Sequence, residues 1–173
     1  MSFVYEDELN RIKSILDDTG ETVEFGPAAE SDIEYLEGLL YPDSVIAFYE
    51  AAEPSSWVEI NGAILTPVSD IWGENENGLP GDVVIEFGFL NIGGTASGDG
   101  YWLDSSKISG GGEPPVVLMA HDQVSEGQGY NDIRHACAPV ADSFKDFLNK
   151  FSHGLLPENA LETMNANMDT GPV

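Results

Sequence analysis

Hydrophobic positions in the first fifty residues recur at intervals of three and four, the spacing of amphipathic helices. They predict helices over residues 4–16, from Pro27 to about residue 40, and over residues 43–52. Pro42 separates the last two helices, because its ring interrupts the preceding pattern. Helices therefore come first in this chain.

The pattern then changes to the alternation that is typical of strands. Residues 57–60 and 63–65 flank Asn61 and Gly62, a pair that favours a two-residue β-hairpin turn. Residues 83–90 alternate most regularly and predict the strongest strand. Further short strands are expected at residues 100–103, at 116–121 and, as a strand or a turn, at 133–137.

Polar and glycine-rich segments separate these strands. We expect a short turn or one helical turn over residues 67–72 and a loop over residues 73–82. Residues 93–100 are expected to form a mobile hairpin loop, and residues 109–113 a flexible loop.

The end of the chain returns to helical spacing. A last amphipathic helix is predicted from Pro139 to about Phe151, and the weakly patterned tail after Gly154 is expected to be mobile. Helices, then a block of strands, then one helix indicate an α+β fold, because parallel sheets need alternating strands and helices. We therefore expect a mostly antiparallel sheet flanked by helices, two to three N-terminal and one C-terminal.

Charge changes the picture most. The chain has 31 Asp and Glu against 6 Lys and Arg, a formal net charge of −25. No Lys, Arg or His occurs between Ser14 and Ser106. Such a surface repels nucleic acid and anionic membranes and attracts metal ions or a basic protein. The alternative is that the acidity serves solubility or a salty cytoplasm.

The single cysteine, Cys137, excludes an internal disulfide and favours a reducing compartment, with the cytoplasm as our expectation. The first residues lack the apolar core of a secretory signal. No apolar run is long enough to span a bilayer.

Several pieces of the chain occur in the order seen in one known family. They are residues 33–42 with a leucine-proline step, the helix 43–49, the strand and turn 64–71, the strand 85–88, the segment 98–104 that closes on an aspartate, the strand 117–121, and the helix 141–148. Together they resemble the SUKH superfamily, which includes the yeast cell-wall-assembly regulator domain and many bacterial immunity proteins.

The resemblance covers residues 25–152. It leaves residues 1–24 as an N-terminal helical extension and residues 153–173 as a C-terminal tail. It implies a binding scaffold without catalytic residues or cofactor: many members neutralise a particular toxin, and others act in regulation through protein contacts. One departure follows the third helix, where the family often has Asn-Gly and this chain has Glu53 and Pro54.

Three other kinds of site are less favoured. The glycines of residues 93–100 lack the Lys-Ser/Thr and the helix of a phosphate loop. The oxygen-rich residues 70–82 could ligate calcium but do not match the EF-hand spacing. His135 and Cys137 could pair as base and nucleophile only with an orienting third group, and a buried free thiol is the alternative.

We therefore expect a protein-binding module, namely an immunity-type inhibitor of a cationic toxin such as a nuclease. A regulatory or scaffold domain that binds through an apolar patch is the alternative, and an enzyme is the least favoured class. The interface is expected on loops beside the sheet, with Trp72 as an exposed hot spot. The candidate partner-binding residues are Asp70, Trp72, Glu74, Glu76, Asp82, Asp99 and Asp104.

Overall fold

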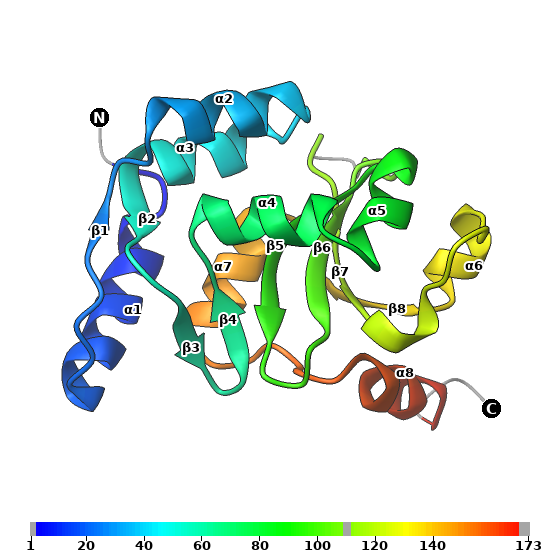
Figure 1. The fold of residues 1–173 in the computed structure, drawn as a ribbon. Coiled ribbons are helices and arrows are strands. Elements are labelled where there is room, and N and C mark those ends of the chain that lie inside the picture. Colours follow the sequence, from blue (N-terminus) through cyan, green and yellow to red (C-terminus); the bar gives the residue numbers. More distant parts are fainter. Residues whose placement is uncertain (1–2, 109–111, 170–173) are drawn as a thin grey trace.

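The computed structural model describes residues 3–108 and 112–169, and it is α+β, as the order of elements predicts (Figure 1). Among these residues, six strands form one antiparallel sheet in chain order, and a two-stranded sheet lies apart from it. The large sheet consists of β3 (Val58–Ile60), β4 (Ala63–Leu65), β5 (Phe89–Thr95), β6 (Gly100–Asp104), β7 (Val116–Met119) and β8 (Cys137–Ala141). The small sheet pairs β1 (Phe25–Gly26) with β2 (Glu53–Pro54).

Helices surround the large sheet. They are α1 (Glu6–Thr19), α2 (Glu30–Gly38), α3 (Asp43–Ala52), α4 (Val68–Glu76), α5 (Gly81–Val84), α6 (Tyr130–Arg134), α7 (Phe144–Ser152) and α8 (Ala160–Asp169), with short 3-10 turns at Ile85–Phe87 and His121–Gln123. Within the described residues, none of these helices combines the length and the apolarity that a bilayer crossing needs.

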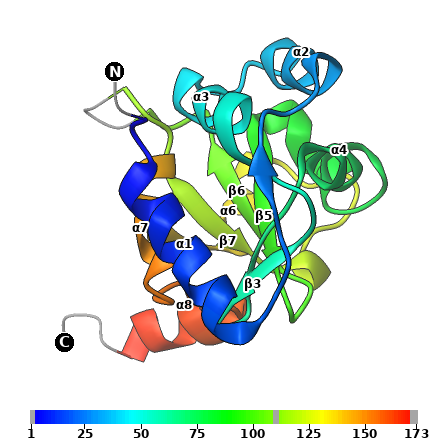
Figure 2. The same ribbon diagram turned by 90° about the vertical axis from the view of Figure 1, so that its left-hand side faces the viewer.

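The sheet buries both of its faces. Tyr101, Leu103 and Leu118 point into a core shared with α1, α3 and α7. Their neighbours Trp102 and Val117 point the other way, into a second core with α5 and α6. Figure 2 shows α1 and α7 on one side of the sheet and α4 on the opposite side.

The β3–β4 hairpin is confirmed. Asn61 and Gly62 both have positive φ angles, 50° and 84°, as a type I′ turn requires. Val58 pairs with Leu65, and Ile60 pairs with Ala63. This turn places Ile64 on the sheet face that looks toward α4.

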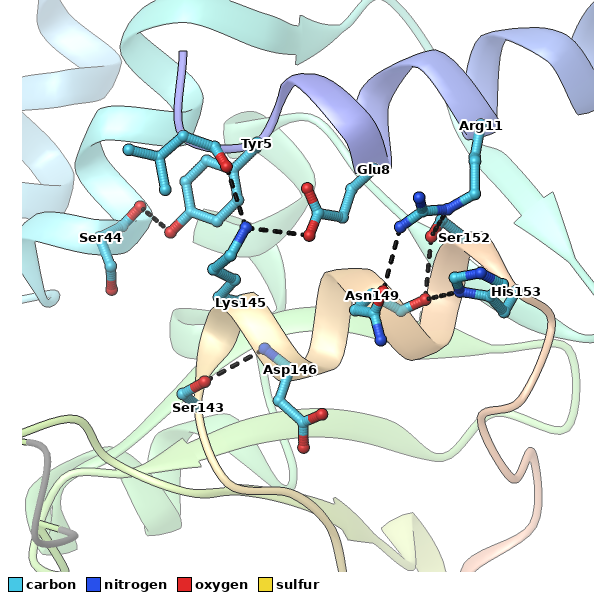
Figure 3. A network of polar contacts seen from close by, with 11 residues as sticks. Tyr5, Glu8, Arg11, Ser44, Ser143, Lys145, Asp146, Asn149, Ser152 and His153 are labelled. Atoms are coloured by element: carbon cyan, nitrogen blue, oxygen red, sulfur yellow. Dashed lines mark hydrogen bonds and ion pairs between the residues drawn. The ribbon is translucent and has the colours of Figure 1, made fainter. Parts of the chain in front are cut away.

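The N-terminal extension is part of the main core rather than an appendage. Tyr5, Leu9, Ile12 and Leu16 are buried in it. Polar contacts join α1 to α7, a region that we call the α1–α7 seam (Figure 3): Lys145 Nζ donates to Glu8 Oε1 at 3.0 Å and to the carbonyl of Val4 at 2.9 Å. Arg11 donates to Asn149 Oδ1 and Ser152 Oγ, both at 3.0 Å.

The prediction of a mobile tail is wrong for the residues that the structure describes. The tail runs along the turns of the β3–β4 and β5–β6 hairpins and then forms α8 (Figure 1). Asn61 Nδ2 donates to the carbonyl of Gly154 at 3.1 Å, and Ser97 Oγ donates to that of Glu158 at 2.7 Å. Residues 170–173 lie outside the described residues, as do residues 109–111 of the predicted flexible loop.

The predicted strand over residues 83–90 is also wrong. Residues 83–87 form the end of α5 and a 3-10 turn, and the strand begins only at Phe89. A Cβ on Gly81 would lie 1.8 Å from the carbonyl oxygen of Glu74, so this backbone is packed against the end of α4. The adjacent Val83 and Val84 both lie in the short helix α5 and are both buried. Alternating hydrophobic residues in the sequence therefore do not distinguish this helical turn from a strand.

The predicted glycine loop contains the end of a strand instead. β5 continues through Gly93, Gly94 and Thr95, paired with β4 on one side and β6 on the other. A Cβ on Gly93 would lie 2.7 Å from the carbonyl oxygen of Ile64. These glycines therefore allow close approach of two backbones rather than mobility.

Helix ends differ from prediction where the neighbouring elements decide them. The third helix is confirmed over Asp43–Ala52, whereas α2 begins only at Glu30 and leaves Leu40 beyond its end. Pro139 lies in β8, an edge strand, which is where sheets accept proline, and α7 begins after the N-cap Ser143. The segment predicted as a strand or turn, residues 133–137, ends α6 and begins β8.

Candidate functional site

Helix α4 carries four of the seven candidate residues. The prediction of a loop over residues 73–82 is wrong, because α4 continues to Glu76. Val68, Ile71 and Asn75 are buried and form its inner face. The outer side presents Asp70, Trp72, Glu74 and Glu76, which we call the α4 ridge.

Asn75 fastens this ridge to the sheet. Its Nδ2 donates to Tyr41 Oη at 2.9 Å, and its Oδ1 accepts the backbone N–H of Asn91 at 3.0 Å. Tyr41 Oη in turn donates to the carbonyl of Asn91 at 2.7 Å. The network is buried, so its hydrogen bonds are shielded from water and position α4 firmly on β5.

A cavity of about 210 Å³ lies between the ridge, β4 and the end of β5. Asp70 and Glu74 enter it from the same flank of α4, because they are four residues apart. Its other walls include Trp57, Thr66, Thr95 and Asp99. We call it the Trp57 cavity.

A second hollow, of about 220 Å³, lies on the opposite flank of α4. Trp72 and Ser69 line it from α4, and Ser31, Asp32 and Tyr35 line it from α2. The exposed fraction of Trp72 is 48%, so its expected exposure is confirmed. The ridge is thus flanked on each side by a hollow with a tryptophan in its wall.

The charged side chains of the ridge are all negative. Within the described part of the chain, no ion pair involves a carboxylate of α2 or α4. Burial raises the pKa of Glu74 above the ordinary value for a glutamate, and the nearby charge of Asp70 raises it further. The ridge therefore concentrates negative charge that the protein itself leaves uncompensated.

Asp99 and Asp104 occupy a different environment. Asp99 is only 6% exposed; its Oδ1 lies 2.7 Å from His121 Nδ1, and its Oδ2 accepts the N–H of Ala160 at 2.8 Å. Asp104 is 1% exposed and accepts hydrogen bonds from Ser106 Oγ at 2.6 Å and Tyr130 Oη at 2.7 Å. Both carboxylates hold the fold together and offer little surface to a partner.

Asp82 is exposed in the first turn of α5, and it lines neither hollow. The exposed members of the predicted interface that lie together are therefore those of the α4 ridge.

The alternative sites find little support in the geometry. Cys137 Sγ donates to the carbonyl of Ile133 at 3.3 Å, and burial, with the charge of Asp104, raises its pKa to about 12. A nucleophilic cysteine needs the opposite shift. Among the described residues, no group of three or more His, Cys, Asp or Glu side chains is placed to hold a metal ion.

Trp57 was missed as a site residue, although the sequence contained a signal for it. Val58 and Ile60 are buried, so Trp57 and Glu59 must share the outward face of β3. Trp57 is 59% exposed. Its partners in the cavity come from residues 64–99, and no local pattern joins them.

The arrangement combines carboxylates with aromatic walls, so it is suited to holding a cation. Comparison with known proteins adds no relative: no family model matches the chain, and no curated protein matches it significantly.

Proposed function

We propose that this chain is a protein-binding module that holds a cationic partner protein on the α4 ridge, and that it acts as an immunity-type inhibitor by covering the active surface of a basic toxin. The observation that carries the proposal is the ridge itself. Three carboxylates and Trp72 project from α4, a helix whose inner face is buried in the core. Residues 15–105 contain no basic side chain that could neutralise these carboxylates.

Both steps of such binding have a physical basis. A surface of one charge raises the rate of encounter with an oppositely charged protein by long-range attraction. Exposed tryptophans then contribute most of the short-range affinity when they are covered. Trp72 and Trp57 lie on either side of the carboxylates and are available for this role.

Inhibition of a nuclease would use the same charges in a specific way. A nuclease active site is built to hold phosphates, and carboxylates on the ridge would occupy the same basic groups. The SUKH resemblance of residues 25–152 supports this direction, because many members of that family neutralise toxins. It supplies no partner residue for this chain.

A regulatory or scaffold domain is the second candidate. The exposed Trp57, Trp72 and Leu79 favour it, because apolar side chains at a surface are typical of protein contacts. Such a contact would depend little on salt. The two candidates therefore differ in a quantity that is simple to measure.

The test is capture of partners from a lysate of the native cell with three forms of the full chain. One is the wild type. The second carries Asp70→Asn, Glu74→Gln and Glu76→Gln on the ridge. The third is a matched control that removes the same charge at Glu50, Glu126 and Glu162, which are exposed elsewhere.

We expect a basic protein that the wild type and the control retain at low salt and release as salt rises, and that the ridge variant fails to retain. When the captured basic protein is expressed alone, it should inhibit growth, and co-expression of the wild-type chain should restore growth. A partner retained equally by the ridge variant and the control would refute the assignment to α4. A partner held at high salt would favour the scaffold.

A further inference from the structure

We propose that the Trp57 cavity binds the guanidinium group of an arginine side chain supplied by the partner. The inference deepens the proposed function and rests on it. It assigns one class of side chain to one cavity.

Thr66, which lines the cavity, carries a buried polar group without a partner among the described residues. Ala63 and Leu65 point into the core with α7, so the alternation of β4 turns Ile64 and Thr66 toward the cavity. Thr66 is 8% exposed, and among the described residues its Oγ1 has no hydrogen-bond partner. A buried hydroxyl without a partner is unfavourable, so a ligand that donates a hydrogen bond there gains from it.

The walls select a cation. Asp70 and Glu74 line one side, and Asp99 contributes a third carboxylate whose oxygens are already engaged by His121 and Ala160. Glu59 pairs with Ile64 across the hairpin and adds negative charge on the same face. An anion would be repelled by all of these groups. The cavity lining offers a metal ion only two carboxylates with free oxygens, those of Asp70 and Glu74.

The shape favours a guanidinium over an ammonium. A guanidinium is planar, offers five N–H donors and stacks on aromatic rings, whereas an ammonium is a compact and strongly hydrated charge. Trp57 supplies an exposed indole, Asp70 and Glu74 supply acceptors, and Thr66 supplies the inner hydroxyl. An arginine side chain uses all three kinds of group at once.

The experiment uses Nα-acetyl-arginine amide as the probe and the uncharged isostere Nα-acetyl-citrulline amide as its control. Each is titrated into the full chain while amide shifts are followed by nuclear magnetic resonance, with Gly94 and Gly98 as reporters in the cavity wall. For a ligand of this size we expect a dissociation constant on the order of one millimolar. The citrulline probe should bind at least tenfold more weakly.

Variants then test each wall. Glu74→Gln and Asp70→Asn should each weaken arginine binding roughly fivefold. Trp57→Ala should weaken it roughly two- to fivefold, the range for an exposed cation–π contact. Thr66→Val keeps the shape and should weaken binding while leaving thermal stability unchanged or higher. Glu50→Gln, which changes the same charge on α3, should have no effect.

Equal binding of both probes, or shifts that spare Gly94 and Gly98, would overturn the inference. So would wild-type affinity in both Glu74→Gln and Asp70→Asn. Capture of a basic partner at the ridge without any arginine binding refutes this inference alone. Arginine binding without a captured basic partner refutes the proposed function and leaves the cavity assignment standing.

Discussion

The α1–α7 seam and the α4 ridge both gather carboxylates, but only the seam provides cations for them. Glu8 is 5% exposed and lies 3.0 Å from Lys145 (Figure 3), and within α7 Asp146 lies 3.2 Å from Lys150. On the ridge, Asp70 adds to the repulsion that Glu74 experiences. Charge in the seam therefore stabilises the fold, whereas charge on the ridge opposes it slightly and remains available to a partner.

The two regions also differ in how they are held. Several aromatic rings pack beneath the seam, including Tyr5, Phe48 and Phe144 in edge-to-face contact. Below the ridge, the buried amide of Asn75 hydrogen-bonds α4 to β5, beside the buried side chains of Val68 and Ile71. Substitutions in the two regions should therefore separate stability from binding.

The largest expected effect comes from Asn75→Leu. It leaves the N–H of Asn91 buried without its acceptor and removes a partner of Tyr41. We expect a loss of about 2–4 kcal/mol in the free energy of unfolding, because each buried group left unpaired costs about 1–3 kcal/mol. Urea denaturation measures it. The exposed neighbour Asn77→Leu is the control, and a loss of equal size there would show that the network is not responsible.

Breaking the seam should cost less. Lys145→Met leaves the nearly buried Glu8 without its cation, and we expect a loss of about 1–3 kcal/mol at neutral pH. The exposed Lys107→Met serves as the control and should stay within about 0.5 kcal/mol of the wild type. Partner binding on the ridge should be unaffected by Lys145→Met at temperatures where the variant is folded. Loss of binding there would contradict the separation of the two regions.

The smallest effect has the opposite sign. Since the pKa of Glu74 is raised in the folded state, its protonation favours folding. This contribution is fully present below the pKa of an unfolded glutamate, about 4.3, and is lost as the pH rises through the folded pKa. Glu74→Gln should therefore stabilise the protein at pH 7, within about 0.5 kcal/mol, and the gain should vanish near pH 3.

Thermal unfolding at the two pH values checks this prediction. A variant that is more stable and binds arginine more weakly would show directly that Glu74 serves the cavity at the expense of the fold. A destabilised variant would place Glu74 with the seam carboxylates instead.

Local patterns determined much of this protein. The three N-terminal helices, the Asn61–Gly62 hairpin, the α+β class and the exposure of Trp72 all followed from residues close together in the chain. Helical and strand periodicity are properties of such short windows. The charge asymmetry was likewise visible in the sequence, because it depends on composition alone.

Tertiary contacts decided the rest. Within residues 81–95, helical turns replace most of the expected strand, and a strand replaces the start of the expected glycine loop. The reason is tertiary packing: Gly81 packs against the end of α4, and Gly93 packs against the backbone of Ile64. Asp99 became an internal acceptor for Ala160, 61 positions away in the chain, and Asp104 became one for Tyr130, 26 positions away. The Trp57 cavity joins β3, β4, α4 and the end of β5, and only packing brings these elements together, because no periodicity extends across turns that reverse the chain.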